Sequence, residues 1–333
     1  MVKKVRKKKV VVIGGGTGTS VVLSGLKNEA KLDLTAIVAV FDSGGSTGRL
    51  RDEFGFLAVG DLRQCLAALA DGRYQEDIRN LLLYRFNKGN GLKGHNLGNL
   101  ILTALEYLSN SPAQAIETAA RIFRINGRVY PITEKDTSLK IHYQDGTINI
   151  GEHTLDDSRY GGKRITKIEL EPKSQIYKKA AAAIESADMI ILGPGDLYAS
   201  LLVNALPKGF KAALKENKGK FVYIVNLMTH YAQTHKMTAK DHLTEVIRYC
   251  GRRPDIVILN SEQMPADLAA RYARCKEFPI RDDLVNLEQS QIIKAKLLSK
   301  SLIQQNKSDT VIRTLLRHDA YKLAKVLVKI VNP

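Results

Sequence analysis

Short aliphatic runs in this chain are repeatedly followed by glycine-rich loops. The runs are Val10–Ile13, Ala36–Val40 and Met189–Leu192, and the loops after them are 14–18, 42–51 and 193–196. Unbroken aliphatic runs of this length are typical of buried parallel strands. Because the carboxyl ends of parallel strands lie along one edge of a sheet, where open α/β sheets bind ligands, we expect the three loops to share one crevice.

Helix signals alternate with further strands along most of the chain. The predicted helices are Ser20–Lys27, Leu62–Ala70, Leu100–Leu108, Ala115–Phe123, Ser174–Ser186, Tyr198–Ala205, Thr238–Cys250 and Ala320–Val331, and the further strands are Phe221–Val225 and Asp255–Leu259. Ser111 before Pro112 has the pattern of an N-cap followed by the first helical residue. Asp61 and Gln64 have the spacing of an N-cap and its reciprocal partner.

The segment from about Arg128 to Glu171 breaks this alternation. Its β-rich runs are Val129–Ile132, Leu139–Tyr143, Thr147–Ile150 and Ile165–Leu170. Asp145-Gly146 is a hairpin turn signal, so we predict a small antiparallel β insertion at about 128–171. The predicted fold class is α/β: residues 10–333 form one Rossmann-like domain with a doubly wound, mainly parallel sheet, after a basic tail over residues 1–9.

Composition narrows the class of protein. The chain has 333 residues, of which 44% are hydrophobic, which is ordinary for a globular protein. No apolar run approaches the roughly 18 residues of a membrane span, and the basic start lacks the apolar stretch of a secretory signal. Cys65, Cys250 and Cys275 are odd in number and far apart, which favours reduced thiols. We therefore expect a cytoplasmic protein.

The net charge of +17 includes six positive charges within Lys3–Lys9. Such a balance suits nucleic acid, anionic lipid or small anionic ligands. Aromatic residues make up only 6% and are not interleaved with the basic ones, so no stacking platform for nucleic acid is visible. We expect a small anionic ligand and no nucleic acid. A tail that binds nucleic acid or a protein partner is the weaker alternative, and the oligomeric state stays open, a homo-oligomer included.

The loop 14–18 is suited to bind an anion. Gly14 and Gly16 fit the dinucleotide fingerprint G-x-G-x-x-G, but Thr19 stands at the third glycine position. No Gly-Lys-Ser/Thr follows, so this is not a Walker A loop either. Three adjacent glycines and Thr17 before a helix still present backbone amides to a phosphate.

The loop 42–51 is the densest in polar groups. The hydroxyls of Ser46 and Thr47 can hold phosphate oxygens, and Arg49 or Arg51 can neutralise them. Asp42 suits a ribose hydroxyl or a magnesium ion, or it caps the next helix.

Two other motifs supply polar groups. His95, Asn96 and Asn99 offer hydrogen bonds to a base, a sugar or a phosphate, or cap the following helix. Asp196 would repel a bare phosphate, so it is better suited to a hydroxyl, an amine or a bridging cation. The histidines at 230, 235 and 242 lack the spacing of a zinc-binding helix, and no nucleophile–base pair is visible.

Taken in order, these motifs resemble the CofD/YvcK-like family. The matching stretches are Gly14–Gly18, Asp42–Arg51, Gly60–Arg63, Gly94–Asn99, Gly193–Tyr198, Asn226–Thr229 and Arg317–Asp319. The resemblance implies a Rossmann-like fold with a crevice for a nucleotide or nucleotide sugar. One branch contains magnesium-dependent 2-phospho-L-lactate transferases, which use a guanosine diphosphate-linked substrate. The YvcK branch contains cytoplasmic gluconeogenesis factors that bind uridine diphosphate (UDP) sugars and are tied to cell shape and envelope precursor supply.

The stretches Gly195–Tyr198 and Arg317–Asp319 place this chain nearer the YvcK branch. Ser43 departs from the family pattern, which has a second aspartate there, so one carboxylate that would bind metal or act as a base is missing. Our leading hypothesis is a UDP-sugar-binding regulatory protein linked to carbon partitioning, cell shape and envelope synthesis. The ligand-binding residues we predict are Gly14, Gly15, Gly16, Thr17, Gly18, Gly44, Gly45, Ser46, Thr47, Gly48, Arg49, Arg63, His95, Asn96, Asn99, Gly193, Pro194, Gly195, Asp196, Asn226, Thr229 and Arg317.

The alternative hypothesis is a phosphotransferase that uses a nucleoside diphosphate-linked substrate. In it, Asp42 and Asp61 are the catalytic residues and the ligands of Mg²⁺, the one candidate cofactor, and the arginines stabilise charge on the transferred group.

Overall fold

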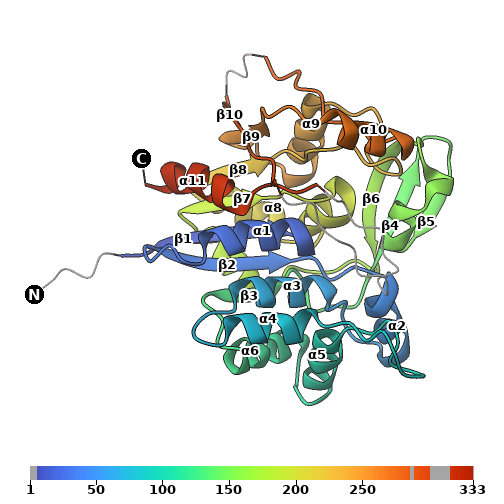
Figure 1. Cartoon of the computed structure of the whole chain (residues 1–333), viewed down its shortest axis with the longest axis vertical. Helices are drawn as coiled ribbons and strands as arrows, with labels where there is room; N and C mark the ends of the chain where they lie inside the picture. The colour runs from blue at the N-terminus through green and yellow to red at the C-terminus, as the bar shows by residue number, and fades with distance from the viewer. Residues whose placement is uncertain (1–5, 286–288, 301–315, 333) are drawn as a thin grey trace, which may run out of the picture.

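A seven-stranded sheet runs through residues 6–285, 289–300 and 316–332, the part of the chain that this computed structural model describes (Figure 1). Its strands are β1 (Lys8–Gly14), β2 (Leu32–Val38), β3 (Arg128–Pro131), β7 (Met189–Leu192), β8 (Lys220–Ile224), β9 (Ile256–Asn260) and β10 (Gln291–Ala295). Their order is β10-β9-β8-β7-β1-β2-β3, and every neighbouring pair is parallel. The predicted doubly wound α/β sheet is confirmed.

The direction of winding reverses between β1 and β7. From β1 the chain adds β2 and β3 on one side, and from β7 it adds β8, β9 and β10 on the other. The two central strands are paired from Val10 opposite Met189 to Ile13 opposite Leu192. The loops after them therefore start side by side and lead to helices that diverge, which opens a crevice at this edge.

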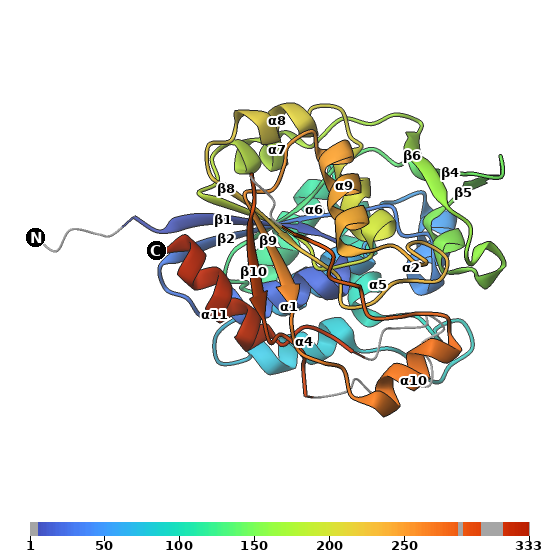
Figure 2. The same cartoon turned by 90° about the horizontal axis from the view of Figure 1, so that it is seen from above.

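Helices cover both faces of the sheet; α7, α8 and α9 lie on one face and α1 and α11 on the other (Figure 2). Their bounds are α1 (Gly16–Leu26), α2 (Gly45–Phe54), α3 (Gly60–Leu69), α4 (Gln75–Leu83), α5 (Leu97–Tyr107), α6 (Pro112–Ile122), α7 (Lys178–Glu185), α8 (Phe210–Glu216), α9 (Ala239–Cys250), α10 (Ala266–Arg274) and α11 (Ala320–Val331). None of these helices is both long and apolar enough to cross a membrane.

A small antiparallel sheet lies beyond the carboxyl ends of β1 and β2, opposite the N-terminus in Figure 1. It consists of β4 (Ser138–Tyr143), β5 (Ile148–Ile150) and β6 (Ile165–Glu171), in the order β5-β4-β6. The hairpin predicted at Asp145-Gly146 is confirmed, since β4 and β5 are antiparallel on either side of it. Two short helical turns, η1 (Glu152–Asp156) and η2 (Ser158–Tyr160), lead from β5 to β6.

Two assignments at the edges of the predicted segments were wrong. The run Val129–Ile132 was assigned to the antiparallel insertion, but β3 is the edge strand of the parallel sheet and pairs with β2. A short β-rich run does not itself specify its partner, which is why local pattern misplaced it. Likewise, β1 begins at Lys8, inside the predicted basic tail, and residues 1–5 of that tail lie outside the described residues.

Helix caps were predicted with mixed success. Ser111 caps α6, with its Oγ accepting from the Gln114 N–H at 3.3 Å, as predicted. Asp61 does not cap α3, whose N-cap is Val59; Asp61 lies in the first turn instead. Gln64 accepts a hydrogen bond from the Thr17 hydroxyl at 3.0 Å rather than returning to the helix start. This pair joins α3 to the first glycine loop.

Two other helices begin about one turn away from their predicted starts. Helix α1 begins at Gly16, within the first glycine loop, rather than at Ser20, and α7 begins at Lys178 rather than Ser174. The predicted helix Tyr198–Ala205 is a π-helical turn, η3 (Leu197–Leu201), followed by a 3₁₀ turn, η4 (Leu202–Ala205). Both glycine loops at the centre of the sheet therefore pass directly into helical backbone.

Candidate functional site

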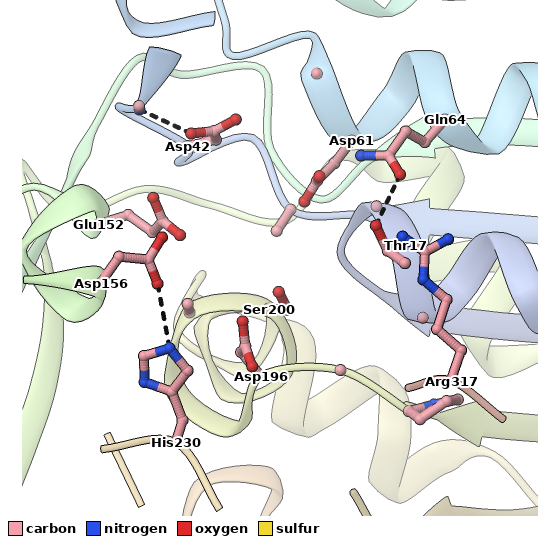
Figure 3. Close-up of a pocket in the computed structure, with 18 of the residues that line it drawn as sticks. Thr17, Asp42, Asp61, Gln64, Glu152, Asp156, Asp196, Ser200, His230 and Arg317 are labelled. Atoms are coloured by element: carbon pink, nitrogen blue, oxygen red, sulfur yellow. Dashed lines mark hydrogen bonds and ion pairs between the residues drawn. The ribbon is translucent and has the colours of Figure 1, made fainter. Parts of the chain in front are cut away.

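A cavity of about 260 Å³ opens at the carboxyl edge of the parallel sheet (Figure 3). Its walls come from the loops after β1, β2, β7 and β8, from η1 and from the residues that precede α11. The predicted site residues that line it are Gly16, Thr17, Gly18, Asp42, Gly44, Ser46, Thr47, Asp61, Arg63, Asn99, Pro194, Gly195, Asp196, Asn226, Thr229 and Arg317. Segments far apart in the sequence therefore gather around one space, as expected of a doubly wound sheet.

The first and third glycine loops touch at the bottom of the cavity. A Cβ atom on Gly18 would overlap the carbonyl oxygen of Pro194, so only glycine allows this approach. A Cβ on Gly15 would lie 2.6 Å from Asp61 Oδ2 and 2.7 Å from Ser200 Oγ. The N-terminus of α1 is thereby enclosed by polar side chains, and its amides face the space where an anion would lie.

The second loop is held from behind by the stretch Gly94–Asn99. Asn99 Nδ2 donates to Thr47 Oγ1 at 3.3 Å and to Ser46 Oγ at 3.4 Å, and the Asn96 N–H donates to Ser46 Oγ at 3.3 Å. His95 Nδ1 lies 3.3 Å from the same hydroxyl. These residues orient the first turn of α2, and of them only Asn99 reaches the cavity wall.

Several predicted residues lie outside the cavity lining: Gly14, Gly15, Gly45, Gly48, Arg49, His95, Asn96 and Gly193. Arg49 is exposed on α2, and Arg51 forms an ion pair with Asp136 at 2.8 Å. Side chains one turn into a helix point along its flank, so neither arginine lies over the loop that the sequence suggested. The cations that line the cavity are Arg63, Arg85 and Arg317, and the histidines that line it are His153, His230 and His318.

Carboxylates outnumber these cations around the space. The acidic residues that line the cavity are Asp42, Asp61, Glu152, Asp156, Asp196 and Glu277. Burial raises the pKa of Glu152 well above its usual range, and the negative charges of Asp42 and Asp156 raise it further. Figure 3 shows Glu152 and Asp156 extending from η1 into the space that Asp42, Asp61 and Asp196 also face.

His230 lies beside two of these carboxylates. Its Nε2 lies 3.5 Å from Asp156 Oδ1 and 3.9 Å from Glu277 Oε1. Enclosure within the cavity, followed by repulsion from Asp196, raises the pKa of Asp156 to about 6, although His230 acts in the opposite direction. Burial also raises the pKa of Glu277. This side of the cavity therefore exchanges protons near neutral pH.

Sequence reasoning missed Glu152, Asp156 and His230. The first two lie in what was interpreted as a plain β insertion, and His230 was tested only against zinc spacing. Ser43 helps to place Glu152 and Asp156: its Oγ accepts from the His153 N–H at 3.0 Å and lies 2.9 Å from His153 Nδ1. The residue that replaces a family aspartate thus ties η1 to the second loop.

The far wall carries the predicted polar residues of the C-terminal half. Asn226 Oδ1 accepts from the Gly195 N–H at 3.4 Å, which joins the loops after β7 and β8. Thr229 is bonded in both directions to Phe278, at 2.8 and 2.9 Å, and so places the neighbouring Glu277 at the wall. Arg317 reaches the cavity from the residues just before α11.

The residues fit a divalent cation only together with a ligand. Within the described ranges, no three His, Cys, Asp or Glu side chains converge closely enough to hold a metal. Mg²⁺, however, is commonly bound by one or two carboxylates with phosphate oxygens and water completing its shell. Asp42 and Asp61 are suitable, because both raise the pKa of Glu152 by their charge and therefore act on the same space.

Comparison with known proteins agrees with this architecture. The family model described as 2-phospho-L-lactate transferase CofD matches residues 10–300. The chain is 34% identical over 331 residues to the protein of Bacillus subtilis named "Gluconeogenesis factor", which covers 98% of this chain and 99% of that protein. It is 36% identical over 327 residues to the protein of the same name in Listeria innocua, covering 98% and 96%.

A solved structure gives the same result in three dimensions. A member of the UPF0052 family from Bacillus halodurans superposes with a TM-score of 0.86 at 34% identity, and the match covers 97% of this chain and 99% of that one. The glycine-loop motifs, the doubly wound sheet and these relatives lead to one conclusion. The chain belongs to the CofD family.

Proposed function

We propose that this protein binds a UDP sugar in the cavity and acts as a regulatory protein of the gluconeogenesis-factor type. One observation carries the proposal: three glycine-rich loops and six carboxylates face a single cavity at the winding reversal of the sheet. Backbone amides at the start of α1 and α2 suit a diphosphate. The proposed links to carbon partitioning, cell shape and envelope synthesis, and a cytoplasmic location, rest on the family resemblance.

The diphosphate is proposed to lie over Gly16–Gly18 and the first turn of α2. Ser46 and Thr47 offer hydroxyls there, and Asn99 orients both. The surrounding carboxylates would repel a bare diphosphate, so binding requires a cation between them. Asp42 and Asp61 would hold this Mg²⁺, which when bound neutralises the phosphates.

The nucleoside and the sugar are proposed to occupy the rest of the cavity. Asn226, Thr229 and Arg317 carry donors and acceptors suited to a base or ribose. Asp156 accepts hydrogen bonds from sugar hydroxyls when it is ionised, and a protonated Glu152 can donate one to a sugar oxygen. A neutral, hydroxyl-rich group fits this acidic side better than a second phosphate does.

Phosphotransferase activity is the second candidate function, and Asp156 is the observation that favours it. A carboxyl with a pKa of about 6 beside His230 can accept a proton near neutral pH. The missing aspartate at Ser43 argues against it, because Ser43 is engaged with His153. The family description as a transferase keeps this alternative in view.

Calorimetric titration tests the binding proposal. UDP-N-acetylglucosamine, UDP-glucose and GDP are titrated with Mg²⁺ and again with EDTA. We expect saturable binding of the UDP sugars with Mg²⁺ and at least about tenfold weaker binding with EDTA. Heat from none of the three nucleotides, and no thermal stabilisation by any, would rule the proposal out. Release of UMP or GMP during incubation with an acceptor would favour the transferase instead.

A further inference from the structure

A second cavity, of about 380 Å³, lies on the other side of η3 from the first. Tyr198 of η3 lines it, whereas the next residue, Ala199, lines the first cavity. Its remaining walls are 162–166 at the start of β6, the loop 233–237 and α9. Asp241, Thr244, Glu245 and Arg248 form the α9 wall, spaced i, i+3, i+4 and i+7 along one helix face.

Both carboxylates of this cavity are already engaged. Asp241 Oδ2 accepts from the Thr238 N–H at 2.9 Å and from its hydroxyl at 3.1 Å, in the capping box of α9. Glu245 Oε2 accepts from the Tyr198 hydroxyl at 3.2 Å, and its Oε1 lies 3.3 Å from Arg248 Nη1. Glu245 is therefore paired with a cation, and Asp241 is held by two neutral donors at the start of its own helix.

The donors of the cavity are less fully used. Lys163 pairs with Asp145 at 2.7 Å, but Arg164 and Lys236 form no ion pair with other described residues. Gln233 is only 3% exposed; its Oε1 accepts from the Ala199 N–H at 3.4 Å, while its Nε2 has no hydrogen-bond partner in the described part of the chain. A buried amide donor without a partner is costly, so an acceptor that reaches Nε2 would be bound favourably.

We propose that this second cavity is a binding site for a small phosphate-bearing anion. Gln233 supplies a buried neutral donor, and Arg164 and Lys236 supply charge, a combination suited to several oxygens of one compact group. The inference is independent of the function proposed for the first cavity, because none of these three residues lines that cavity.

Binding of an anion at this site would affect the first cavity through η3. Gln233 is bonded to Ala199, and Tyr198 to Glu245, so one short π-helical turn contacts both spaces. π-helical turns often occur at functional sites. An anion bound to Gln233 would therefore act on η3, the turn that directly follows Asp196. Asp196 itself lines the first cavity.

Titration of the full chain with inorganic phosphate and with glycerol 3-phosphate, in EDTA, tests the proposal. Citrate serves as a carboxylate probe. Gln233→Glu keeps the acceptor for Ala199 but replaces the donor with a carboxylate oxygen, and should weaken phosphate binding at least about tenfold. Arg164→Ala should weaken it about fivefold, and Arg164→Lys less. Arg121→Ala, on α6, and Arg317→Ala, in the first cavity, should leave phosphate binding unchanged.

The outcomes separate cleanly. Saturable phosphate binding that Gln233→Glu and Arg164→Ala weaken, and that the two controls do not, supports the site. The proposal is overturned if no phosphate compound binds, if citrate alone binds, if Arg317→Ala is the variant that weakens binding, or if the controls lose as much as the test variants. Matched far-ultraviolet circular dichroism shows that Gln233→Glu is folded. If it is not, Arg164→Ala decides.

Discussion

The cavities on the two sides of η3 have opposite electrostatic character. The first gathers six carboxylates against few cations, whereas the second has its two carboxylates engaged and leaves Arg164 and Lys236 without an ion pair among the described residues. An anion in the first therefore needs a cation as intermediary, and an anion in the second does not. The difference teaches that phosphate-binding backbone alone does not define an anion site, because the surrounding side chains decide whether binding requires metal.

The largest effect should come from Gly18→Ala. Its Cβ would meet the carbonyl oxygen of Pro194, a backbone atom that cannot move without displacing the loop after β7. We expect a loss of roughly 2–4 kcal/mol in unfolding free energy and loss of nucleotide binding. Chemical denaturation and calorimetry measure these two effects.

Gly44→Ala is the matched control for stability. A Cβ there would meet only Asp42 Oδ1, at 3.4 Å, and Gly44 has an extended backbone with φ −99. Its stability should change little. Below the unfolding temperature, Gly18→Ala should keep phosphate binding in the second cavity within about twofold, since the two sites differ in lining. An equal loss of nucleotide binding in the first cavity and of phosphate binding in the second would show that the two cavities are not separate sites.

Asp61→Asn should give the next largest effect, and it should change UDP-sugar affinity in opposite directions in Mg²⁺ and in EDTA. In Mg²⁺, loss of a metal-binding oxygen charge should weaken UDP-sugar binding by at least about tenfold. In EDTA, the same change removes a repulsive charge and should strengthen the residual binding. Asp71→Asn, an exposed loop residue bonded to its own turn, should change neither. Weakening in both buffers would show that the carboxylate acts on the ligand directly and not through a cation.

Local signals in the sequence predicted the centre of this molecule well. Aliphatic runs and glycine loops located β1, β2 and β7, because strand, turn and helix start are encoded within a few residues. The resemblance then brought Arg317 into the site, although no local pattern near that residue indicates a pocket. The predicted loops meet at one cavity, but several predicted side chains lie outside its lining, Arg49 the clearest among them, and ligand binding by the others stays a prediction.

Features that depend on distant pairing could not be predicted. The partner of β3 and the return of η1 to the sheet edge are set by contacts far apart in the chain, such as Ser43 with His153. Glu152 and Asp156 enter the cavity only because of that return. The second cavity depends similarly on β6 packing beside α9, shown by the Ile168 N–H donating to the Tyr249 hydroxyl at 2.8 Å.

Asp156 should make binding in the first cavity dependent on pH. Its pKa is raised to about 6, so the ionised carboxylate that accepts hydrogen bonds from sugar hydroxyls is lost as the pH drops from 7 to 5, and UDP-sugar affinity should fall. Without ligand, Asp156 should make the unfolding free energy depend on pH in the opposite direction. The folded state binds the Asp156 proton more tightly than the unfolded state does, so stability rises as the pH falls from about 6 towards 4. Asp156→Asn should reduce both dependences. Titration calorimetry and thermal denaturation at several pH values would show it, and an unchanged pH profile of affinity would remove Asp156 from the account.

Tyr198→Phe should have the smallest effect and is the most direct test of communication between the two cavities. The change removes one hydroxyl, which donates to Glu245, and leaves the ring in place. Unfolding free energy should fall by about 0.5–1.5 kcal/mol, the usual contribution of one hydrogen bond.

If η3 couples the cavities, phosphate should alter UDP-sugar affinity in the parent protein, and the variant should reduce that change about twofold while each ligand still binds alone. Thr244→Val, on the same wall, is the control, because the Thr244 hydroxyl donates to the Lys240 carbonyl of its own helix. A parent protein in which phosphate leaves UDP-sugar affinity unchanged would mean that the two cavities, though one turn apart, bind independently.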